Sequence, residues 1–391
     1  MAEARPATGV RILTVASHAG MLIFGVVMAL LGAVLPPVSA HLGFNLAQAG
    51  QLFLTMNFCM LVCSLAVGPA MDRFGMKAPM VFGPLAVGGA LVLVALAASF
   101  HALLVAVAVL GLGGGALNSA TNTLVADLHP DAARKNAALN LLGMFFGCGA
   151  LLLPFVIGAL LSRLGLAWIL YAASAPCIGA AVWGASLRFP SPKQGRRMPA
   201  SALPGFLRMP IVWGFALLLF CESGNEFLLG GYISTYLARE LRLTVSAASY
   251  ALTGFWAAIM LSRVISSRVL LRVPGQRMVM LSAAVAAVTS AGLAVAGSPS
   301  TAVMAVVALG FGLAGIYPTT LGLAGARFAE HSGTVFGILF TIALAGGMTL
   351  PWVVGQVANA YGMRLGLAIA PASFCMILAL ALAIPRWPVT Q

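Results

Sequence analysis

The sequence predicts an all-α membrane protein with twelve transmembrane helices in two six-helix halves. Three observations lead to this prediction: the composition is too apolar for a soluble fold, the apolar runs have the length of membrane-spanning helices, and two of these runs repeat two others. Of the 391 residues, 61% are hydrophobic and only 7% are charged, whereas a soluble domain carries about 25% charged residues. The chain therefore has too little polar surface to fold in water.

The apolar runs predict helices and not barrel strands. A helix needs about 20 residues to cross the hydrocarbon core, and lipid allows only helices or closed barrels to span it. The runs lack the alternating pattern of barrel strands. The first run follows Arg5 and Arg11 but is too long for a signal peptide and has no convincing cleavage site, so it is expected to be the first membrane helix. Breaks at charged or Pro/Gly-rich positions give helices at residues 12–40, 47–70, 78–99, 102–127, 137–162, 167–187, 211–238, 245–271, 277–296, 301–326, 333–359 and 364–385.

The net charge of +13 is explained by where the 21 basic residues lie. Four of them, Arg163, Arg239, Arg242 and Arg364, fall on one side of the predicted topology, and the other 17 fall on the opposite side. Because basic loops stay in the cytoplasm, this asymmetry places both termini on the cytoplasmic side of a bacterial inner membrane. Anionic membrane lipids are then the natural partners, and no nucleic acid is needed. The 17 residues are Arg5, Arg11, Arg73, Lys77, Arg134, Lys135, Arg188, Lys193, Arg196, Arg197, Arg208, Arg263, Arg268, Arg272, Arg277, Arg327 and Arg386.

A polar segment and a repeat divide the chain into halves. Residues 188–210, with five basic residues and five prolines, predict a cytoplasmic linker between residues 1–187 and residues 211–391. Matching residues recur 197 positions apart, which is the plan of a transporter with its site between two halves that rock against each other. In helices five and eleven the matches are Gly149, Leu153, Pro154, Val156, Gly158 and Gly165 with Gly346, Leu350, Pro351, Val353, Gly355 and Gly362. In helices four and ten they are Leu112, Gly113, Gly115, Thr123 and Leu124 with Leu309, Gly310, Gly312, Thr320 and Leu321.

The loop between the second and third predicted helices carries a spaced motif. Its residues are Gly68, Asp72, Arg73, Gly75 and Lys77. The motif resembles the G-x-x-x-D-R-x-G-R-[KR] signature of the major facilitator superfamily, with Met76 where that family usually has Arg. The resemblance covers the whole chain and implies the twelve-helix major facilitator fold. It also implies that the five motif residues form a gate on the cytoplasmic side, where Asp72 can meet a helix N-terminus.

Three further stretches are similar to the fucose and hexose proton symporters of that superfamily. They are residues 138–140 with 146–154, residues 312–319, and residues 332–337 with 346–351. The similarity implies a sugar-like solute moved by symport. Where the fucose symporters carry acids in helices one and four, this chain has Gly32 and Asn118, so coupling is expected to lie elsewhere.

Glu222 and Glu226, in the seventh helix, are the acids predicted to lie inside the membrane, since the other six fall in loops or at helix ends. Their spacing stacks both on one helix face, about 16 and 22 Å from the helix start in a core about 30 Å thick. A charge at such depth costs about 2.5–3.5 kcal/mol, so these residues normally mark ion or substrate pathways. No interior Lys or Arg is expected beside them. We therefore predict that they are ion-coupling residues, and two close carboxyls away from water favour one staying protonated.

Polar side chains elsewhere in the predicted helices are candidates for substrate binding. Asn118 and Asn122 lie one turn apart in helix four, and Asn225 lies beside the two acids. An amide both donates and accepts hydrogen bonds, which suits sugar hydroxyls, but such groups equally hold helices together. The remaining candidate residues, for which packing is the alternative, are Asn140, Tyr232, Trp256, Tyr317, Thr319 and Gln356.

The signatures of enzymes and pumps are missing from the sequence. It has no P-loop lysine motif, no nucleotide-binding pattern and no convergent nucleophile, base or metal cluster. The six cysteines lie within apolar runs and are expected to be packing residues. The five histidines are scattered and are expected near the membrane interfaces. We therefore expect no enzymatic activity, no cofactor and no metal.

Together these features predict a monomeric secondary transporter that moves a small, sugar-like polar solute with H⁺ or Na⁺ by alternating access. One alternative is an exporter of amphipathic or drug-like compounds, which apolar lining and Met-rich helices would suit; the breadth of substrates would distinguish it. Another is a non-transporting membrane receptor or scaffold. Labelled cysteines whose accessibility changes on both sides of the membrane would exclude that alternative.

Overall fold

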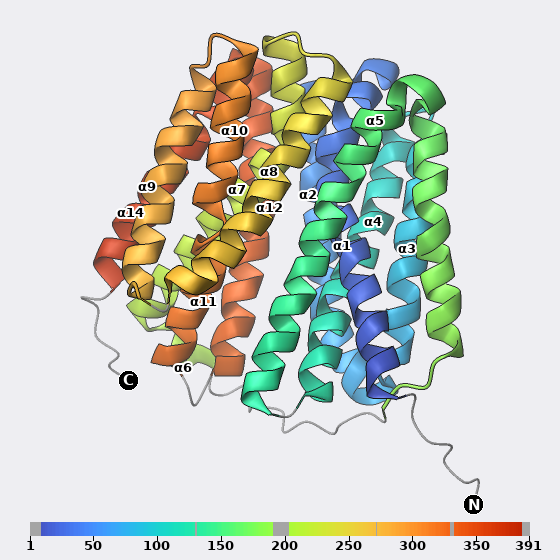
Figure 1. Ribbon diagram of the computed structural model, residues 1–391, viewed down its shortest axis with the longest axis vertical. Helices are drawn as coiled ribbons and strands as arrows, with labels where there is room; N and C mark the ends of the chain where they lie inside the picture. Colours follow the sequence, from blue (N-terminus) through green and yellow to red (C-terminus); the bar gives the residue numbers. More distant parts are fainter. Residues whose placement is uncertain (1–8, 130, 191–202, 271, 329–331, 385–391) are drawn as a thin grey trace, which may run out of the picture. The chain divides into compact units, whose positions relative to one another are not determined.

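The computed structural model describes residues 9–129, 131–190, 203–270, 272–328 and 332–384, and these residues form helices and short connections without a strand (Figure 1). In chain order the helices are α1 (Val10–Leu42), α2 (Leu46–Phe74), α3 (Lys77–Leu96), α4 (Phe100–Leu128), α5 (Ala132–Ser186), α6 (Leu203–Leu207), α7 (Pro210–Glu240), α8 (Val245–Val269), α9 (Gly275–Ala294), α10 (Pro299–Leu313), α11 (Ile316–Arg327), α12 (Ser332–Tyr361), α13 (Met363–Leu367) and α14 (Ile369–Ala383).

The described residues contain the predicted membrane spans. Eleven segments are long and apolar enough to cross a membrane. One of them, Ala137–Ser186, has 50 residues and is interrupted at Gly165, whose φ of 73° and ψ of 161° are not helical. Division at this glycine gives twelve spans, as the sequence predicts, and the all-helical membrane fold is confirmed.

The spans predicted at residues 301–326 and 364–385 each contain a short break, although Pro299–Arg327 and Met363–Ala383 each remain one candidate membrane span. The tenth predicted helix consists of α10 and α11, which meet at Ala314 and Gly315. Pro318 has no N–H to bond to the carbonyl of Ala314, four residues earlier. The twelfth consists of α13 and α14, where Pro371 has the same relation to Leu367. In each case a proline removes one bond of the helix ladder.

Several helices begin at a polar residue that caps the first turn. The side chains of Ser99, Asp131, Thr244 and Ser298 accept hydrogen bonds from backbone N–H groups three residues later, at the starts of α4, α5, α8 and α10. These bonds satisfy N–H groups that have no partner within the helix. The short polar connections therefore define where these spans begin.

The described residues form two compact units. The first unit contains residues up to Leu30 and residues 58–190, and the second contains Leu31–Asn57 and the residues from 203 onward. The last part of α1 and the first part of α2 thus belong to the second unit. Residues 191–202 of the predicted linker lie outside the described residues, and the short helix α6, within the remainder of that segment, was not predicted.

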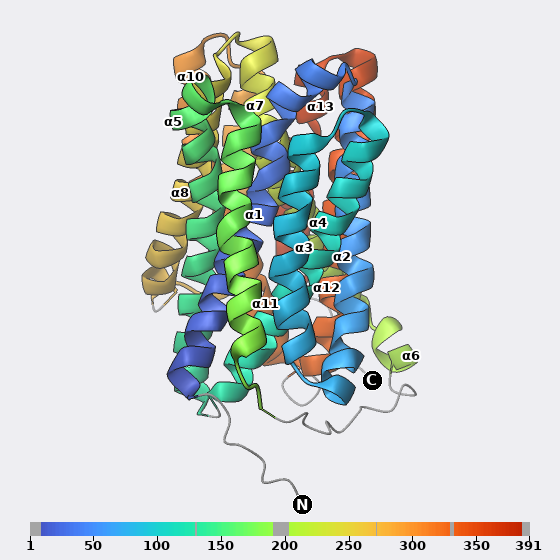
Figure 2. The same cartoon turned by 90° about the vertical axis from the view of Figure 1, so that its right-hand side faces the viewer.

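Corresponding glycines of the two units make similar contacts. In the first unit α3 packs against α4 and α5 (Figure 2), and Gly149 of α5 lies directly against the backbone carbonyl of Leu22 in α1. In the second unit α12 packs against α7, and Gly346 lies against the carbonyl of Phe220. Neither position leaves room for a Cβ atom, and small residues allow such close helix packing in membranes. The two glycines are 197 residues apart, which agrees with the predicted repeat.

Candidate functional site

The two acids of α7 are buried inside the second unit. Glu222 is 1% exposed and Glu226 is 8% exposed. They lie 12 and 16 residues after Pro210, the first residue of α7, which places them about 18 and 24 Å along the helix axis. Both carboxyls are therefore deep within the span, where an ionised group needs a compensating partner.

Arg263 of α8 provides that partner, so the expectation that no basic residue lies beside the acids is wrong. Its Nη2 atom is 3.7 Å from Oε1 of Glu226, and the two side chains are 30% and 11% exposed. Arg263 lies six residues before the end of α8, or about 9 Å inside the span. Arg263 was predicted to be one of the cytoplasmic basic residues, although the helix predicted at 245–271 already contained it. An arginine side chain is long enough to reach inward from such a position.

Tyr317, at the start of α11, completes a cluster that we name the carboxyl site: Glu222, Glu226, Arg263 and Tyr317. Glu222 interacts electrostatically with Glu226 and Arg263, and Tyr317 interacts with all three charged groups. Oε2 of Glu222 and Oε1 of Glu226 are buried and make no hydrogen bond within the described residues. The site therefore combines two carboxyls, one guanidinium and unused acceptor capacity, which suits binding of a cation.

Asn225 and Thr319 are also buried in the second unit. The Nδ2 group of Asn225 donates a hydrogen bond to Oγ of Ser373 at 3.0 Å, while its Oδ1 atom has no hydrogen-bond partner among the described residues. Oγ1 of Thr319 is likewise buried without such a partner. Asn225 thus connects α7 to α14 and keeps an acceptor, so both the packing and the binding alternatives apply to it.

Three other candidates in the second unit make packing contacts. The hydroxyl of Tyr232 donates to the carbonyl of Pro351 at 3.1 Å, and its ring lies 5.2 Å from that of Phe53. Nε2 of Gln356 donates to the carbonyl of Ala47 at 3.4 Å. Trp256 is 1% exposed and packs against Gly230. These contacts match the packing alternative that the sequence left open.

The candidates of the first unit lie on α4 and α5. Nδ2 of Asn122 donates to the carbonyl oxygen of Asn118 at 2.8 Å and to its Oδ1 at 3.1 Å, and both residues are half-buried. Asn140 is exposed on α5. The two asparagines of α4 therefore orient each other.

His18 was not selected from the sequence as a candidate residue. It is 8% exposed, its ring stacks on that of Phe145 at a centroid distance of 4.4 Å, and Nε2 makes no hydrogen bond within the described residues. The sequence feature that could have identified His18 is its position inside the first apolar run. The structure explains its burial by stacking and gives it no further role.

The structure explains why the spaced motif between α2 and α3 has a glycine at position 75. Gly75 has a φ of +83°, which favours glycine, and its N–H bonds to the carbonyl of Met71 at 2.9 Å, ending α2. The guanidinium of Arg73 lies 5.2 Å from the ring centroid of Phe74. Asp72 is exposed, and no side chain caps the N-terminus of α3. Asp72 therefore does not cap the helix that follows it, although Gly68, Asp72, Arg73, Gly75 and Lys77 all remain gate candidates by resemblance.

We expect Asp72→Ala to lower the transport rate while the protein stays folded, because loss of a latch on the cytoplasmic side would favour the inward-open state. Transport by reconstituted protein and labelling of cytoplasmic cysteines would measure this effect. Asp72→Glu, which keeps the charge, should retain most of the transport. Unchanged kinetics and unchanged labelling in Asp72→Ala would reduce the loop to a signal for membrane insertion.

Comparisons with known proteins agree with the fold. A family model described as "Major Facilitator Superfamily" matches residues 18–222 and 215–390. A "Protein TsgA homolog" of Erwinia tasmaniensis is 22% identical over 92% of this chain and 91% of its own. The nucleoside transporter NupG has a TM-score of 0.79 at 15% identity, with 96% of this chain and 100% of its own covered. The fucose:proton symporter FucP of E. coli has a TM-score of 0.68 at 20% identity, with 96% of this chain and 99% of its own covered.

Proposed function

Because the chain belongs to the major facilitator superfamily, whose members are transporters and not enzymes, we propose that this secondary transporter moves a small, sugar-like polar solute by cation-coupled symport. The carboxyl site is the observation that supports coupling. As in its superfamily, the substrate is a small molecule that crosses a membrane. The protein is proposed to work as a monomer of two alternating halves, residues 1–187 and 211–391, joined by residues 188–210.

The charges of the carboxyl site suit the binding of a single monovalent cation. With both carboxyls ionised, Glu222, Glu226 and Arg263 carry a net charge of −1, and one H⁺ or Na⁺ makes the set neutral. Neutralisation lowers the free-energy cost of keeping these groups away from water. If the site is neutral only when the cation is bound, the transporter changes between its outward-open and inward-open states more easily with the cation than without it. This difference is the basis of coupling that we propose for Glu222 and Glu226.

The proposal of a sugar-like solute is supported by the names of solved structures with this fold. They include a fucose:proton symporter, a D-xylose-proton symporter and a nucleoside transporter. The amides of Asn118, Asn122 and Asn225 offer both donors and acceptors for hydroxyl groups. Tyr317 belongs to the carboxyl site, and Thr319 lies two residues further along the same helix. These residues are the proposed contacts to the solute.

A proteoliposome uptake screen tests the proposed function. Purified protein would be offered labelled sugars, nucleosides and organic acids, with an imposed pH gradient, an imposed sodium gradient, or neither. We expect accumulation of a polyhydroxylated solute only with one of the two gradients. Accumulation without any gradient dependence, or uptake limited to amphipathic drugs, would contradict the proposal.

We also propose that the protein lies in a bacterial inner membrane with both termini in the cytoplasm. Reporter fusions after Arg196 and at the C-terminus should both give a cytoplasmic signal, because 16 of the 21 basic residues remain assigned to that side once Arg263 is placed inside the span. A fusion after Arg242, in the connection between α7 and α8, is the matched control and should give a periplasmic signal. A periplasmic signal after Arg196 would overturn the two-half topology.

A further inference from the structure

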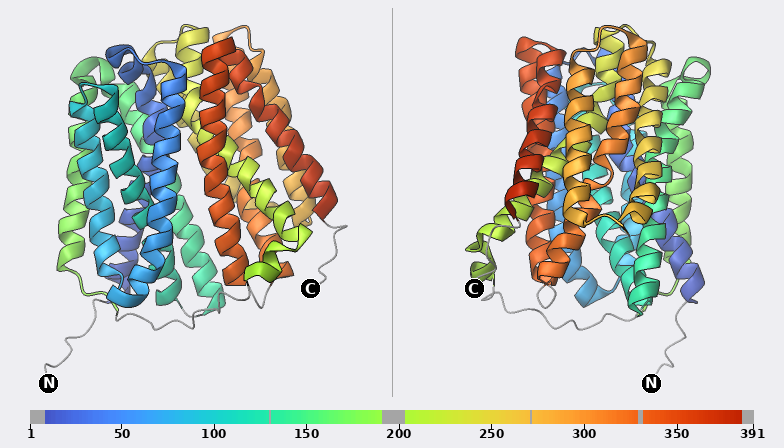
Figure 3. Two further views of the ribbon diagram at one scale, coloured as in Figure 1. Left: turned by 180° about the vertical axis from the view of Figure 1, so that it is seen from behind. Right: turned by 60° about the vertical axis from the view of Figure 1, so that its left-hand side comes forward.

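A cavity of about 240 Å³ lies inside the second unit, and none of its lining residues belongs to the carboxyl site. It is lined by the starts of α7 and α9 and the ends of α11 and α14, which lie together at one end of this unit (Figures 1 and 3). Seven of the ten lining residues are apolar, among them Phe215, Leu218, Val279 and Leu323. The cavity is thus a hydrocarbon-lined space between four helix ends.

The polar groups of the cavity wall are directed to the backbone, with one exception. Oγ1 of Thr320 donates to the carbonyl of Ile316 at 2.7 Å, and Nε2 of Gln276 donates to the carbonyl of Ala381 at 3.0 Å. Arg327, in the last turn of α11, is exposed and supplies the only cation among the lining residues. The cavity therefore combines apolar walls with one guanidinium at its rim.

The end of the unit around this rim is positively charged. The described acids of the second unit, Glu222, Glu226 and Glu240, lie inside α7 or at its opposite end. The charged residues at the helix ends around the cavity and in the adjoining connections are arginines in the described part of the unit. They are Arg208, Arg268, Arg272, Arg277 and Arg327. A ligand at this rim would meet a field that favours an anion.

We propose that the cavity binds one acyl chain of an acidic phospholipid from the surrounding membrane, with the lipid phosphate held by Arg327. An apolar cavity of about 150 Å³ already binds a molecule of benzene size, so this larger one accommodates a segment of a single chain. A guanidinium matches a phosphate with two parallel hydrogen bonds. In the proposed topology this end faces the cytoplasmic leaflet, where acidic lipids attract clustered arginines.

Lipid retention by the full-length protein tests the proposal. The protein would be reconstituted in vesicles of phosphatidylglycerol and phosphatidylethanolamine, extracted gently and examined by native mass spectrometry. We expect the wild type to retain phosphatidylglycerol. Val279→Phe, which fills the cavity, and Arg327→Gln, which removes the rim cation, should each lose it.

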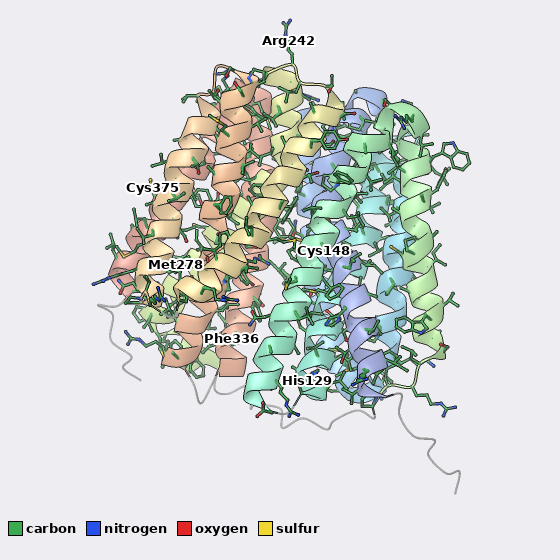
Figure 4. The ribbon with its side chains drawn as sticks, in the orientation of Figure 1. His129, Cys148, Arg242, Met278, Phe336 and Cys375 are labelled. Atoms are coloured by element: carbon green, nitrogen blue, oxygen red, sulfur yellow. The ribbon has the colours of Figure 1, made fainter. Side chains whose placement is uncertain are left out.

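Two matched substitutions serve as controls and should retain the lipid. Val288→Phe makes the same change on the same helix at a side chain that is 73% exposed. Arg242→Gln removes an arginine at the other end of the unit, where its side chain points away from the protein (Figure 4). Size-exclusion chromatography would verify that all four variants stay folded.

The possible outcomes distinguish the proposed phospholipid from other occupants of the cavity. Loss of phosphatidylglycerol in Val279→Phe and Arg327→Gln, with retention in both controls, supports it. Undiminished retention in Val279→Phe or in Arg327→Gln would overturn the assignment to this cavity and its rim. Retention of a free fatty acid in place of the phospholipid, or equal retention of phosphatidylethanolamine, would overturn the identity of the ligand.

Discussion

Glu222→Gln is expected to abolish gradient-driven accumulation of the solute while solute exchange or binding persists. Glutamine keeps the size and hydrogen-bonding capacity of the side chain but cannot titrate or carry a charge. Oε2 of Glu222 makes no hydrogen bond within the described residues, which leaves an acceptor atom for the proposed cation. Accumulation and exchange would be measured in proteoliposomes with the solute found in the uptake screen.

Glu226→Gln should give a similar or smaller loss of accumulation, since Glu226 is the acid paired with Arg263. The matched control is Glu240→Gln at the end of the same helix, where the carboxylate lies 3.8 Å from Arg364 and is one-third exposed. That variant should accumulate the solute normally. If the double variant Glu222→Gln/Glu226→Gln accumulates solute at the wild-type rate, neither acid couples transport and the pair is structural.

Arg263→Gln is expected to destabilise the protein strongly by leaving the carboxylate of Glu226 without its cation. Breaking a buried ion pair from one side costs about 3–5 kcal/mol, and the lower end of that range applies because the arginine side chain is 30% exposed. Thermal unfolding in detergent would show the loss as a lower midpoint. Addition of Glu226→Gln should restore most of the midpoint, since the uncompensated charge is then removed.

Arg268→Gln is the control for this series, because Arg268 is exposed at the end of the same helix. Its unfolding midpoint should stay near that of the wild type. A double variant Arg263→Gln/Glu226→Gln as unstable as Arg263→Gln alone would show that the arginine stabilises the fold by contacts other than this pair. In that case the pair would not explain the burial of Glu226.

The architecture could be predicted from the sequence because it depends on local properties. Runs of about 20 apolar residues must become spanning helices in lipid, whatever their neighbours are. The repeat was readable because glycines such as Gly149 and Gly346 are needed wherever two backbones come into contact. The break near Pro318 was not predicted, because a proline removes one bond of the helix ladder but does not always end a helix, as α12 continues through Pro351.

The sequence by itself also determined that Glu222 and Glu226 share one face of an apolar helix, because their spacing equals about one helical turn. Only the tertiary structure decided which groups face them. Arg263 is 37 residues further along the chain than Glu226, and the direction of its side chain depends on how α8 packs against α7. Likewise, residues 31–57 join the second unit through contacts with distant helices. Helix formation follows from neighbouring residues, whereas side-chain pairing follows from packing between segments that no local pattern relates.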